Sequence, residues 1–587
     1  MIKLFKNFNK KDLLIILACI LVIIFQVWIE LKLPDYMSEI TRLIQNDGSK
    51  MKDILREGSF MLGCAFSSMI SAILVGYFTS MLSASFSLRI REKVFKKVQN
   101  LSIAETKKFS TSSLITRTTN DVTQIEMLLA MGLQSIIKAP IMAFWAVSKI
   151  INKSVTLSGL VGAGVIILLI TVISIMFVVY PRFGKIQKLT DKLNNTTREN
   201  LMGIRVIRAF NAEEFQKDRF SLVNDDFTKT NLTIQKSFSV MMPVMNLVMH
   251  FLTLGIYFIG SFLIVEAMMV DKITLFSDMV VFTSYGMQVI MSFLMLTIIF
   301  MIIPRARVSA NRINEVIESE VSITDGIISK KNNKIRGSIV FNNVSFKYPD
   351  ADEYLLKNIS FEARTGETVA FIGSTGSGKS TLINLIPRFY DVTEGEILVD
   401  GVNVKDYKLD VLHNIIGYVS QKAFMFTGSI RDNVKFGSNG KKIISDKDIN
   451  KALEVAQASE FVNEMEDKID SHIAYGGTNV SGGQKQRLSI ARAIARNPEI
   501  YIFDDTFSAL DYKTDAKLRH DLRKYTKDAT CLIVAQRIGT IINADKIVVL
   551  DNGECVGIGT HKELLKNCSV YKEIALSQFK EEELENA

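Results

Sequence analysis

Six long apolar segments lie in the first 303 residues of this 587-residue chain, and they constrain its fold more than any other feature. They cover residues 13–33, 57–83, 127–149, 156–180, 241–267 and 277–303. A helix needs about 20 apolar residues to cross a hydrocarbon core of about 30 Å, and a spanning backbone must satisfy its own hydrogen bonds. We therefore expect six transmembrane helices, followed by a soluble half.

The first of these segments has a second interpretation, because a cleaved signal peptide also carries cations ahead of an apolar run. Lys3, Lys6, Lys10 and Lys11 precede the segment. The run is long, however, and no small-residue cleavage site follows it, which favours a retained transmembrane helix. We expect residues 1–12 to form a short amphipathic helix, an interfacial elbow, on the cytoplasmic surface.

Lysine and arginine are unevenly distributed between the links that join the apolar segments. Residues 84–126 and 181–240 carry many of them, whereas the links near 150–155 and 268–276 carry few. Because cytoplasmic loops are enriched in these residues, the two long segments and both chain termini are predicted to be cytoplasmic. The net charge of +9 is better explained by contact with anionic membrane lipid than by nucleic acid, so no nucleic-acid partner is expected.

The two halves define the expected domains. Residues 13–316 form a transmembrane domain, residues 317–336 a polar linker, residues 337–580 a soluble domain and residues 581–587 an acidic tail. In the soluble half, short apolar strands alternate with helical segments, a pattern typical of an α/β domain. We expect this domain to have an antiparallel edge and a helical subdomain near residues 422–500.

A phosphate-binding loop of the form G-x-x-x-x-G-K-[ST] follows the apolar run 368–372. It consists of Gly373, Ser374, Thr375, Gly376, Ser377, Gly378, Lys379 and Ser380. In such a loop the backbone N–H groups surround phosphate oxygens, the lysine neutralises charge and the hydroxyl reaches Mg2+. Residues 368–372 are predicted to be a buried strand and residues 381–386 a helix whose N-terminus faces the anion. A chance glycine-rich turn is the alternative.

Two further motifs lie later in the chain. The apolar run 500–503 ends at Asp504, and a strand here would place that carboxylate at the C-terminal edge of a sheet, where it can orient the ligands of Mg2+. Alone, this pattern is weak. A short distance upstream stands the sequence Ser481, Gly482, Gly483 and Gln484, continued by residues 485–493.

Together, the phosphate loop, the motif 481–484 and Asp504 resemble the ATP-binding cassette (ABC) family, and the resemblance extends over almost the whole chain. It implies a half-transporter of the type I exporter class, with six transmembrane helices fused to an α/β P-loop nucleotide-binding domain that has a helical subdomain. It also implies ATP and Mg2+ as cofactors and a multi-pass position in the bacterial cytoplasmic membrane. Short coupling helices are expected near residues 109–117 and 203–210.

The resemblance also implies residue roles. Tyr348 would stack on adenine, Thr381 would complete the phosphate site, and Ser380, Gln421 and Asp504 would hold Mg2+. Taken alone, Tyr348 is an ordinary strand tyrosine and Gln421 a surface amide. In this family each ATP lies between one subunit's phosphate loop and the other subunit's signature. The signature that would contact the partner's ATP comprises Ser481, Gly482, Gly483 and Gln484.

Two positions depart from the family pattern. Asp505 stands where the family has the glutamate that polarises the attacking water, and Gln536 stands where it has the switch histidine. A carboxylate displaced by about 1 Å can lose on the order of a hundredfold in rate. A glutamine amide can hydrogen-bond a γ-phosphate, but it cannot carry a proton near neutral pH.

These departures favour a heterodimer. The chain has weak catalytic residues beside its own phosphate loop but an intact signature. This combination predicts one hydrolysing site, formed by the partner's catalytic residues and this chain's signature. The other site, at this chain's own loop, is degenerate and mainly holds ATP. The expected partner is therefore a second ABC half-transporter. The alternative is sequence drift, in which the chain is a self-sufficient but slow homodimeric ATPase.

The transported compound is less clearly indicated. The segments 241–249 and 293–301 are rich in methionine and phenylalanine, which suit promiscuous apolar binding but equally suit helix packing and lipid contact. His250, Gln288 and Lys138 are the polar candidates for a substrate cavity, although a histidine can also be packed and a lysine can extend to an interface. The preferred interpretation is multidrug-type export of hydrophobic or amphipathic compounds. A lipid flippase, a peptide exporter or a siderophore importer on the same fold remain alternatives.

Overall fold

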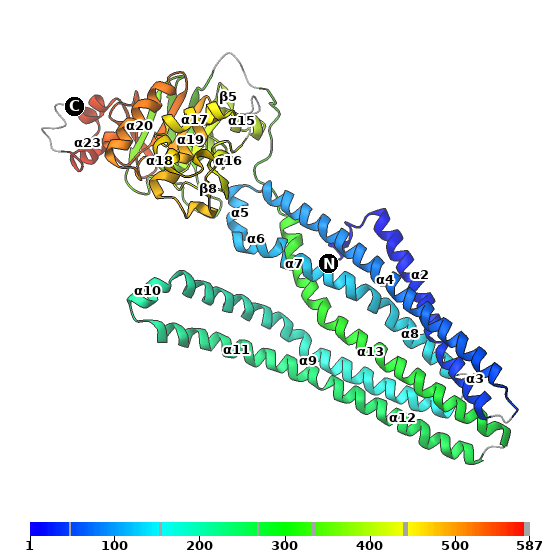
Figure 1. The fold of residues 1–587 in the computed structure, drawn as a ribbon. Coiled ribbons are helices and arrows are strands. Elements are labelled where there is room, and N and C mark those ends of the chain that lie inside the picture. The colour runs from blue at the N-terminus through cyan, green and yellow to red at the C-terminus, as the bar shows by residue number, and fades with distance from the viewer. Residues whose placement is uncertain (46–47, 152–154, 267–268, 331–335, 438–443, 580–587) are drawn as a thin grey trace. The chain divides into compact units, whose positions relative to one another are not determined.

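The computed structural model describes residues 1–45, 48–151, 155–266, 269–330, 336–437 and 444–579. The chain forms two compact units, coloured by residue number in Figure 1. The membrane unit comprises Met1–Gln99 and Ser110–Ser319, and the soluble unit comprises Asn100–Phe109 and Glu320–Ala587. The segment 100–109, expected in a loop of the transmembrane domain, thus belongs to the soluble unit. The expected acidic tail 581–587 lies outside the described residues.

All the regular elements of the membrane unit in the described part of the chain are helices. Its elements are α1 (Ile2–Phe5), α2 (Lys10–Glu30), α3 (Leu33–Gln45), α4 (Met51–Gln99), α6 (Thr111–Thr118), α7 (Asn120–Met127), η1 (Leu128–Gly132), α8 (Leu133–Ile151), α9 (Val155–Met202), α10 (Ile204–Ala209), α11 (Glu213–Ser239), α12 (Met241–Glu266) and α13 (Met269–Ile317). Among the described residues, six segments of these helices are long and apolar enough to cross a membrane, which confirms the six predicted spans.

Several helices are much longer than a bilayer requires. The 49 residues of α4 and of α13 each correspond to roughly 70 Å at about 1.5 Å per residue, about twice the hydrocarbon thickness. The short helices α6 and α10 lie in the segments where coupling helices were expected. The N-terminal helix α1 covers only Ile2–Phe5, and α2 already begins at Lys10, so the expected elbow helix 1–12 is shorter than predicted.

Glycines allow α9 and α12 to approach each other closely, and Figure 1 shows these two helices side by side. A Cβ atom added at Gly164 of α9 would lie 3.0 Å from Leu252, and one added at Gly255 of α12 would lie 2.8 Å from Leu160. Small residues at such contacts are the usual basis of helix packing in lipid, because lipid chains are as apolar as leucine.

The soluble unit contains two main sheets. The antiparallel sheet has the order β2 (Leu356–Ala363), β1 (Ile339–Phe346), β4 (Glu394–Val399), β5 (Val402–Asn403). The second sheet has the order β12 (Glu554–Gly559), β11 (Lys546–Asp551), β3 (Thr368–Gly373), β10 (Thr530–Val534), β9 (Ile500–Asp504), β6 (Ile416–Val419), and only β12 runs antiparallel to its neighbour. The predicted α/β fold with an antiparallel edge is therefore confirmed.

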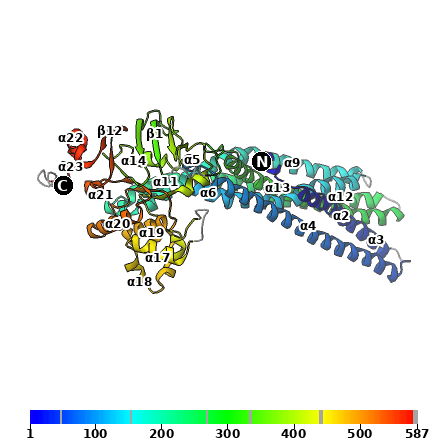
Figure 2. The same cartoon turned by 90° about the horizontal axis from the view of Figure 1, so that it is seen from above.

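Helices surround these sheets. They are α5 (Ile103–Phe109), α14 (Lys379–Asn384), α15 (Leu409–Ile415), α16 (Ile430–Val434), α17 (Asp446–Val455), α18 (Ser459–Glu464), α19 (Gly482–Ala495), α20 (Tyr512–Tyr525), α21 (Ile538–Ile541), α22 (His561–Asn567) and α23 (Ser569–Leu576). Figure 2 shows α17, α18 and α19 gathered on the side of the soluble unit away from β1, as expected of a helical subdomain. Because β3, β9 and β10 are adjacent and parallel, their C-terminal ends meet at one edge, where ligands bind in such sheets.

Candidate functional site: a phosphate loop with an amide-bound aspartate

The phosphate loop lies between β3 and α14, as the sequence predicted, although α14 begins at Lys379 rather than at residue 381. The Lys379 ammonium folds back over the loop. It donates hydrogen bonds to the backbone oxygens of Gly373 at 2.9 Å and Ser374 at 2.7 Å, and to the Ser377 hydroxyl at 3.3 Å. These contacts hold a cation at the centre of the loop.

Two glycines are required by the local geometry. Gly378 has φ +93°, and a Cβ atom there would lie 2.6 Å from the Leu356 side chain. A Cβ atom at Gly373 would overlap the Leu550 carbonyl oxygen. A side chain at Gly373 would therefore overlap the backbone, and one at Gly378 would be strained by the left-handed φ and would displace Leu356. Glycines at both positions also let the backbone N–H groups approach an anion.

Asp504 ends β9 beside this loop. The Ser380 hydroxyl donates to its Oδ1 at 2.7 Å, and the Tyr418 hydroxyl donates to its Oδ2 at 3.4 Å. Burial raises the pKa of Asp504, and the neighbouring Asp505 charge raises it further, while these hydrogen bonds act in the opposite direction. A serine hydroxyl beside a carboxylate is a donor set that fits Mg2+, which is commonly bound by one or two carboxylates together with substrate phosphates.

Asp505 is in contact with the other residue that departs from the family pattern. Its Oδ2 accepts hydrogen bonds from the Nε2 of Gln536 at 2.6 Å and from the Nε2 of Gln421 at 3.1 Å. Its backbone is left-handed, with φ +47°, a conformation that aspartate tolerates better than most residues. Two amides therefore share one oxygen of the carboxylate at the position of the expected catalytic base.

Several of these groups line one cavity of about 410 Å³, a size typical of small-molecule sites, whereas Gly373, Ser374, Ser377 and Asp504 do not line it. The predicted site residues that line it are Thr375, Gly376, Gly378, Lys379, Ser380, Thr381, Gln421, Asp505 and Gln536. Tyr348 lies next to the cavity, since its hydroxyl is 2.9 Å from the Thr381 hydroxyl. The structure thus brings together most of the residues that the sequence assigned to the chain's own ATP site.

The signature does not line this cavity. Ser481 caps α19, where its hydroxyl accepts from the backbone N–H of Gln484 at 3.3 Å and its own N–H donates to the Gln484 side chain at 2.9 Å. Ser481 and Gly482 are exposed. This capping box fixes the start of the helix and leaves its N-terminus open to solvent.

Sequence reasoning missed Lys107, which belongs to α5 of the soluble unit. Its ammonium lies 5.6 Å from the centroid of the Tyr348 ring and 5.9 Å from that of Tyr390. A cation over an aromatic face is attracted by the ring quadrupole. In the sequence Lys107 was only one of many cations in a long loop, so no local pattern could have placed it beside the expected adenine position.

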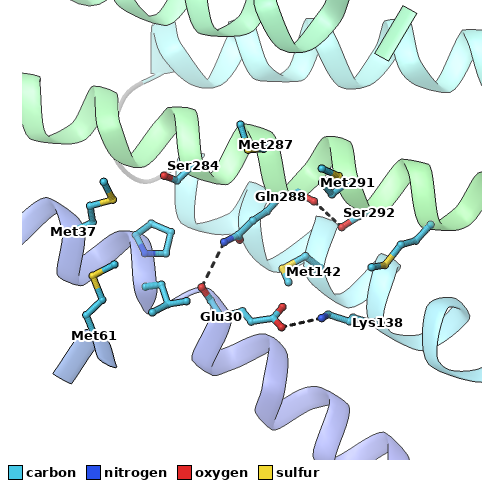
Figure 3. Close-up of a pocket in the computed structure, with 13 residues that line it drawn as sticks. Glu30, Met37, Met61, Lys138, Met142, Ser284, Met287, Gln288, Met291 and Ser292 are labelled. Atoms are coloured by element: carbon cyan, nitrogen blue, oxygen red, sulfur yellow. Dashed lines mark hydrogen bonds and ion pairs between the residues drawn. The ribbon is translucent and has the colours of Figure 1, made fainter. Parts of the chain in front are cut away.

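The membrane unit contains a second cavity, of about 390 Å³, shown in Figure 3. Lys138 and Gln288, two of the three polar candidates for a substrate cavity, line it. His250 does not; it is exposed on α12. Glu30 also lines the cavity and was missed, although an acidic residue within the first apolar segment was a signal that could have found it.

Comparisons with known proteins agree with this architecture. The family described as ABC transporter transmembrane region matches residues 14–301, and the family described as ABC transporter matches residues 356–508. An uncharacterised ABC transporter ATP-binding protein of Mycobacterium tuberculosis is 37% identical over 92% of this chain and 93% of the relative. An ATP-dependent lipid A-core flippase of Aliivibrio fischeri is 30% identical over 93% of this chain and 92% of the relative.

Among solved structures, a bacterial Atm1-family ABC exporter with ATP bound is similar with a TM-score of 0.82. It is 23% identical, and the match covers 97% of this chain and 100% of that one. The likeness shows a shared fold over both units. The chain therefore belongs to the ATP-binding cassette transporter family and joins one exporter-type transmembrane domain to one ATP-binding domain.

Proposed function

We propose that this chain is the degenerate-site subunit of a heterodimeric exporter that moves hydrophobic or amphipathic compounds across the bacterial cytoplasmic membrane. The observation that carries the proposal is the state of Asp505, whose Oδ2 accepts hydrogen bonds from both Gln421 and Gln536. The chain keeps the groups that bind ATP and lacks efficient groups to cleave it.

The chemical reason concerns proton transfer. A general base must reach the attacking water and take its proton. The Asp505 carboxylate is one methylene shorter than glutamate, and two amide donors already occupy its Oδ2. Gln536 offers no group that can exchange a proton near neutral pH. ATP would therefore persist at this loop, where Ser380, Gln421 and Asp504 would supply oxygen ligands to its Mg2+.

The second ATP site would be the hydrolysing one. The exposed N-terminus of α19, with Ser481 and Gly482, is available to a partner subunit that supplies its own loop, glutamate and histidine. ATP would draw the two soluble domains together, and the helices α6 and α10 would transmit that closure to the membrane helices. Hydrolysis at the partner's loop would reset the cycle. Both termini and the soluble domain would face the cytoplasm, as the distribution of lysine and arginine predicts.

A lipid flippase is the second candidate function, and one observation favours it: the relative from Aliivibrio fischeri, 30% identical, is named as an ATP-dependent lipid A-core flippase. Export and flipping use the same ATP chemistry. The two functions differ in whether the transported molecule is taken from the membrane leaflet or from solution.

Purification of the chain alone and with its co-expressed partner tests the heterodimer. We expect ATPase activity near background for the chain alone and clear activity for the pair. Asp505→Ala should change the activity of the pair less than about twofold, because the base at this site contributes little of the usual factor of roughly 10² to 10⁴. Substantial activity of the chain alone, abolished by Asp505→Ala, would instead establish the homodimer.

Replacement of Tyr348 tests nucleotide binding at the chain's own loop. Tyr348→Leu removes the ring and should weaken binding of a non-hydrolysable ATP analogue about tenfold, since stacking of a base on an aromatic ring contributes about 1–3 kcal/mol. Tyr348→Phe keeps the ring and loses only the contact with Thr381, so it is the matched control. Equal binding by the leucine and phenylalanine variants, measured by fluorescence titration, would exclude stacking on Tyr348.

A further inference from the structure

The cavity of the membrane unit combines an adaptable apolar wall with a small polar region. It lies between α2, α3, α4, α8 and α13 (Figure 3), and six methionines line it: Met37, Met61, Met142, Met287, Met291 and Met295. Methionine side chains are flexible and polarisable and adjust to irregular apolar molecules. The volume of about 390 Å³ lies within the range of small-molecule sites.

The polar region is built around an ion pair. The Lys138 ammonium of α8 lies 2.9 Å from Oε1 of Glu30 on α2, and the two side chains are 12% and 19% exposed. The same Oε1 accepts hydrogen bonds from Gln26 at 2.9 Å and from Ser68 at 3.0 Å. Three donors thus converge on one oxygen, whereas Oε2 of Glu30 accepts none from the described residues. An intramembrane charge is costly and commonly marks a substrate pathway.

Gln288 of α13 provides a second unfilled acceptor. Its Oε1 is buried and has no hydrogen-bond partner among the described residues. Its Nε2 lies 3.5 Å from the backbone oxygen of Glu30, and Figure 3 shows the side chain extending from α13 toward α2. An unpaired buried acceptor costs free energy that a ligand donor would recover.

The charges that line the cavity cancel, and this restricts what can enter. A ligand head with a single charge would leave one charge uncompensated in a medium of low polarity, which is strongly unfavourable. A head group that carries both an ammonium and an anionic group can compensate both charges of the cavity. Its ammonium would donate to Glu30 Oε2 and Gln288 Oε1, and its anionic group would accept from the remaining N–H groups of Lys138.

We infer that this cavity binds a zwitterionic amphiphile, with its head at Glu30, Lys138 and Gln288 and its apolar chain against the methionines. The inference rests on the proposed function for the transport of this molecule, whereas binding is measured without ATP. A membrane lipid and a free amphiphile share this chemistry, and the experiment separates them.

The test uses the full chain, with its partner where one is present, in nanodiscs of phosphatidylglycerol without nucleotide. Three fluorescent probes share one dansyl-octyl tail and differ in the head, which is an ammonium, a carboxylate or an amino-acid zwitterion. Wild-type protein should bind the zwitterionic probe at least about tenfold more tightly than either charged probe, a difference of about 1.4 kcal/mol. Equal affinities for all three probes would overturn the inference.

Charge variants sharpen the test. Lys138→Met leaves the Glu30 charge without its countercharge and should reverse the preference toward the ammonium probe, whereas Glu30→Gln should reverse it toward the carboxylate probe. Lys149→Met is the matched control, because Lys149 also lies on α8, pairs with Asp35 at 2.8 Å and does not line the cavity. If the ion pair is merely structural, the variants will lose thermal stability and the three probes will keep the same order of affinity in all of them. That result would overturn the inference. If a variant fails to fold, the wild-type order of affinities still decides.

Phosphatidylethanolamine added to the nanodiscs identifies the source. Displacement of the zwitterionic probe assigns the site to a membrane lipid, and retention assigns it to a free amphiphile; both outcomes support the shared chemistry. Probe binding without ATP-driven export would contradict the proposed function and leave this inference standing. ATP-driven export combined with equal affinities for the three probes would support the proposed function and overturn this inference.

Discussion

Gly482→Asp will lower the ATPase rate of the assembled transporter about a hundredfold if this chain's signature completes the hydrolysing site, because loss of correct positioning alone can cost about that factor. Gly482 is the first residue of α19, it is exposed, and a Cβ atom added there meets nothing within 4 Å. An acidic residue in the first turn also suits the helix dipole. The substitution should therefore leave the fold intact and place a negative charge where the partner's γ-phosphate must dock.

Gly482→Ala is the matched control, since it adds the same Cβ atom without charge and should retain most of the activity. Phosphate release by the purified pair measures both variants, and thermal unfolding confirms that both are folded. An unchanged rate in Gly482→Asp, with a large loss in Asp505→Ala, would place hydrolysis at this chain's own loop. The asymmetric arrangement would then be wrong.

Asp505→Glu combined with Gln536→His will raise hydrolysis at this chain's own loop by about ten- to a hundredfold, which is part of the factor of roughly 10² to 10⁴ that a positioned general base contributes. Glutamate extends the carboxylate by one methylene toward the attacking water. The second change removes the amide that donates to Asp505 Oδ2 at 2.6 Å and supplies a group that titrates near neutral pH. The gain should be measured in the Gly482→Asp background, where hydrolysis at the partner's loop is suppressed.

Asp505→Asn with Gln536→His is the control, because it keeps the shape of the side chain at 505 and removes its basicity. The glutamate and histidine variant must exceed this control in single-turnover ATP cleavage. If the two variants are equally slow, the explanation based on Asp505 and Gln536 fails and the partner's signature must also limit this site. The left-handed backbone at residue 505 disfavours glutamate slightly, so a small loss of thermal stability should accompany the gain.

Much of the architecture followed from local patterns. Apolar segments of sufficient length can cross a membrane only as helices, so the six spans were predictable from the sequence. The phosphate loop was equally predictable, because its glycines stand where a side chain would not fit, as at Gly373, where a Cβ atom would overlap the Leu550 carbonyl oxygen. The boundaries were less accurate: α14 began earlier than predicted, and the expected elbow helix reduced to Ile2–Phe5. Helix ends depend on capping and packing, which a local pattern specifies weakly.

The sequence by itself determined which elements and motifs this protein has: six membrane helices, a phosphate loop and an intact signature. It also showed an aspartate and a glutamine in place of the expected catalytic base and switch histidine. Only the tertiary structure decided which groups meet. Asp505 and Gln536 are 31 positions apart, and Glu30 and Lys138 are 108 apart, yet each pair is within hydrogen-bond distance. Motifs and hydrophobic periods are properties of neighbouring residues, whereas such contacts depend on how whole strands and helices pack. Packing therefore places the Gln536 amide on the Asp505 carboxylate. It also brings Glu30 and Lys138, from separate spans, together in one cavity whose charges cancel.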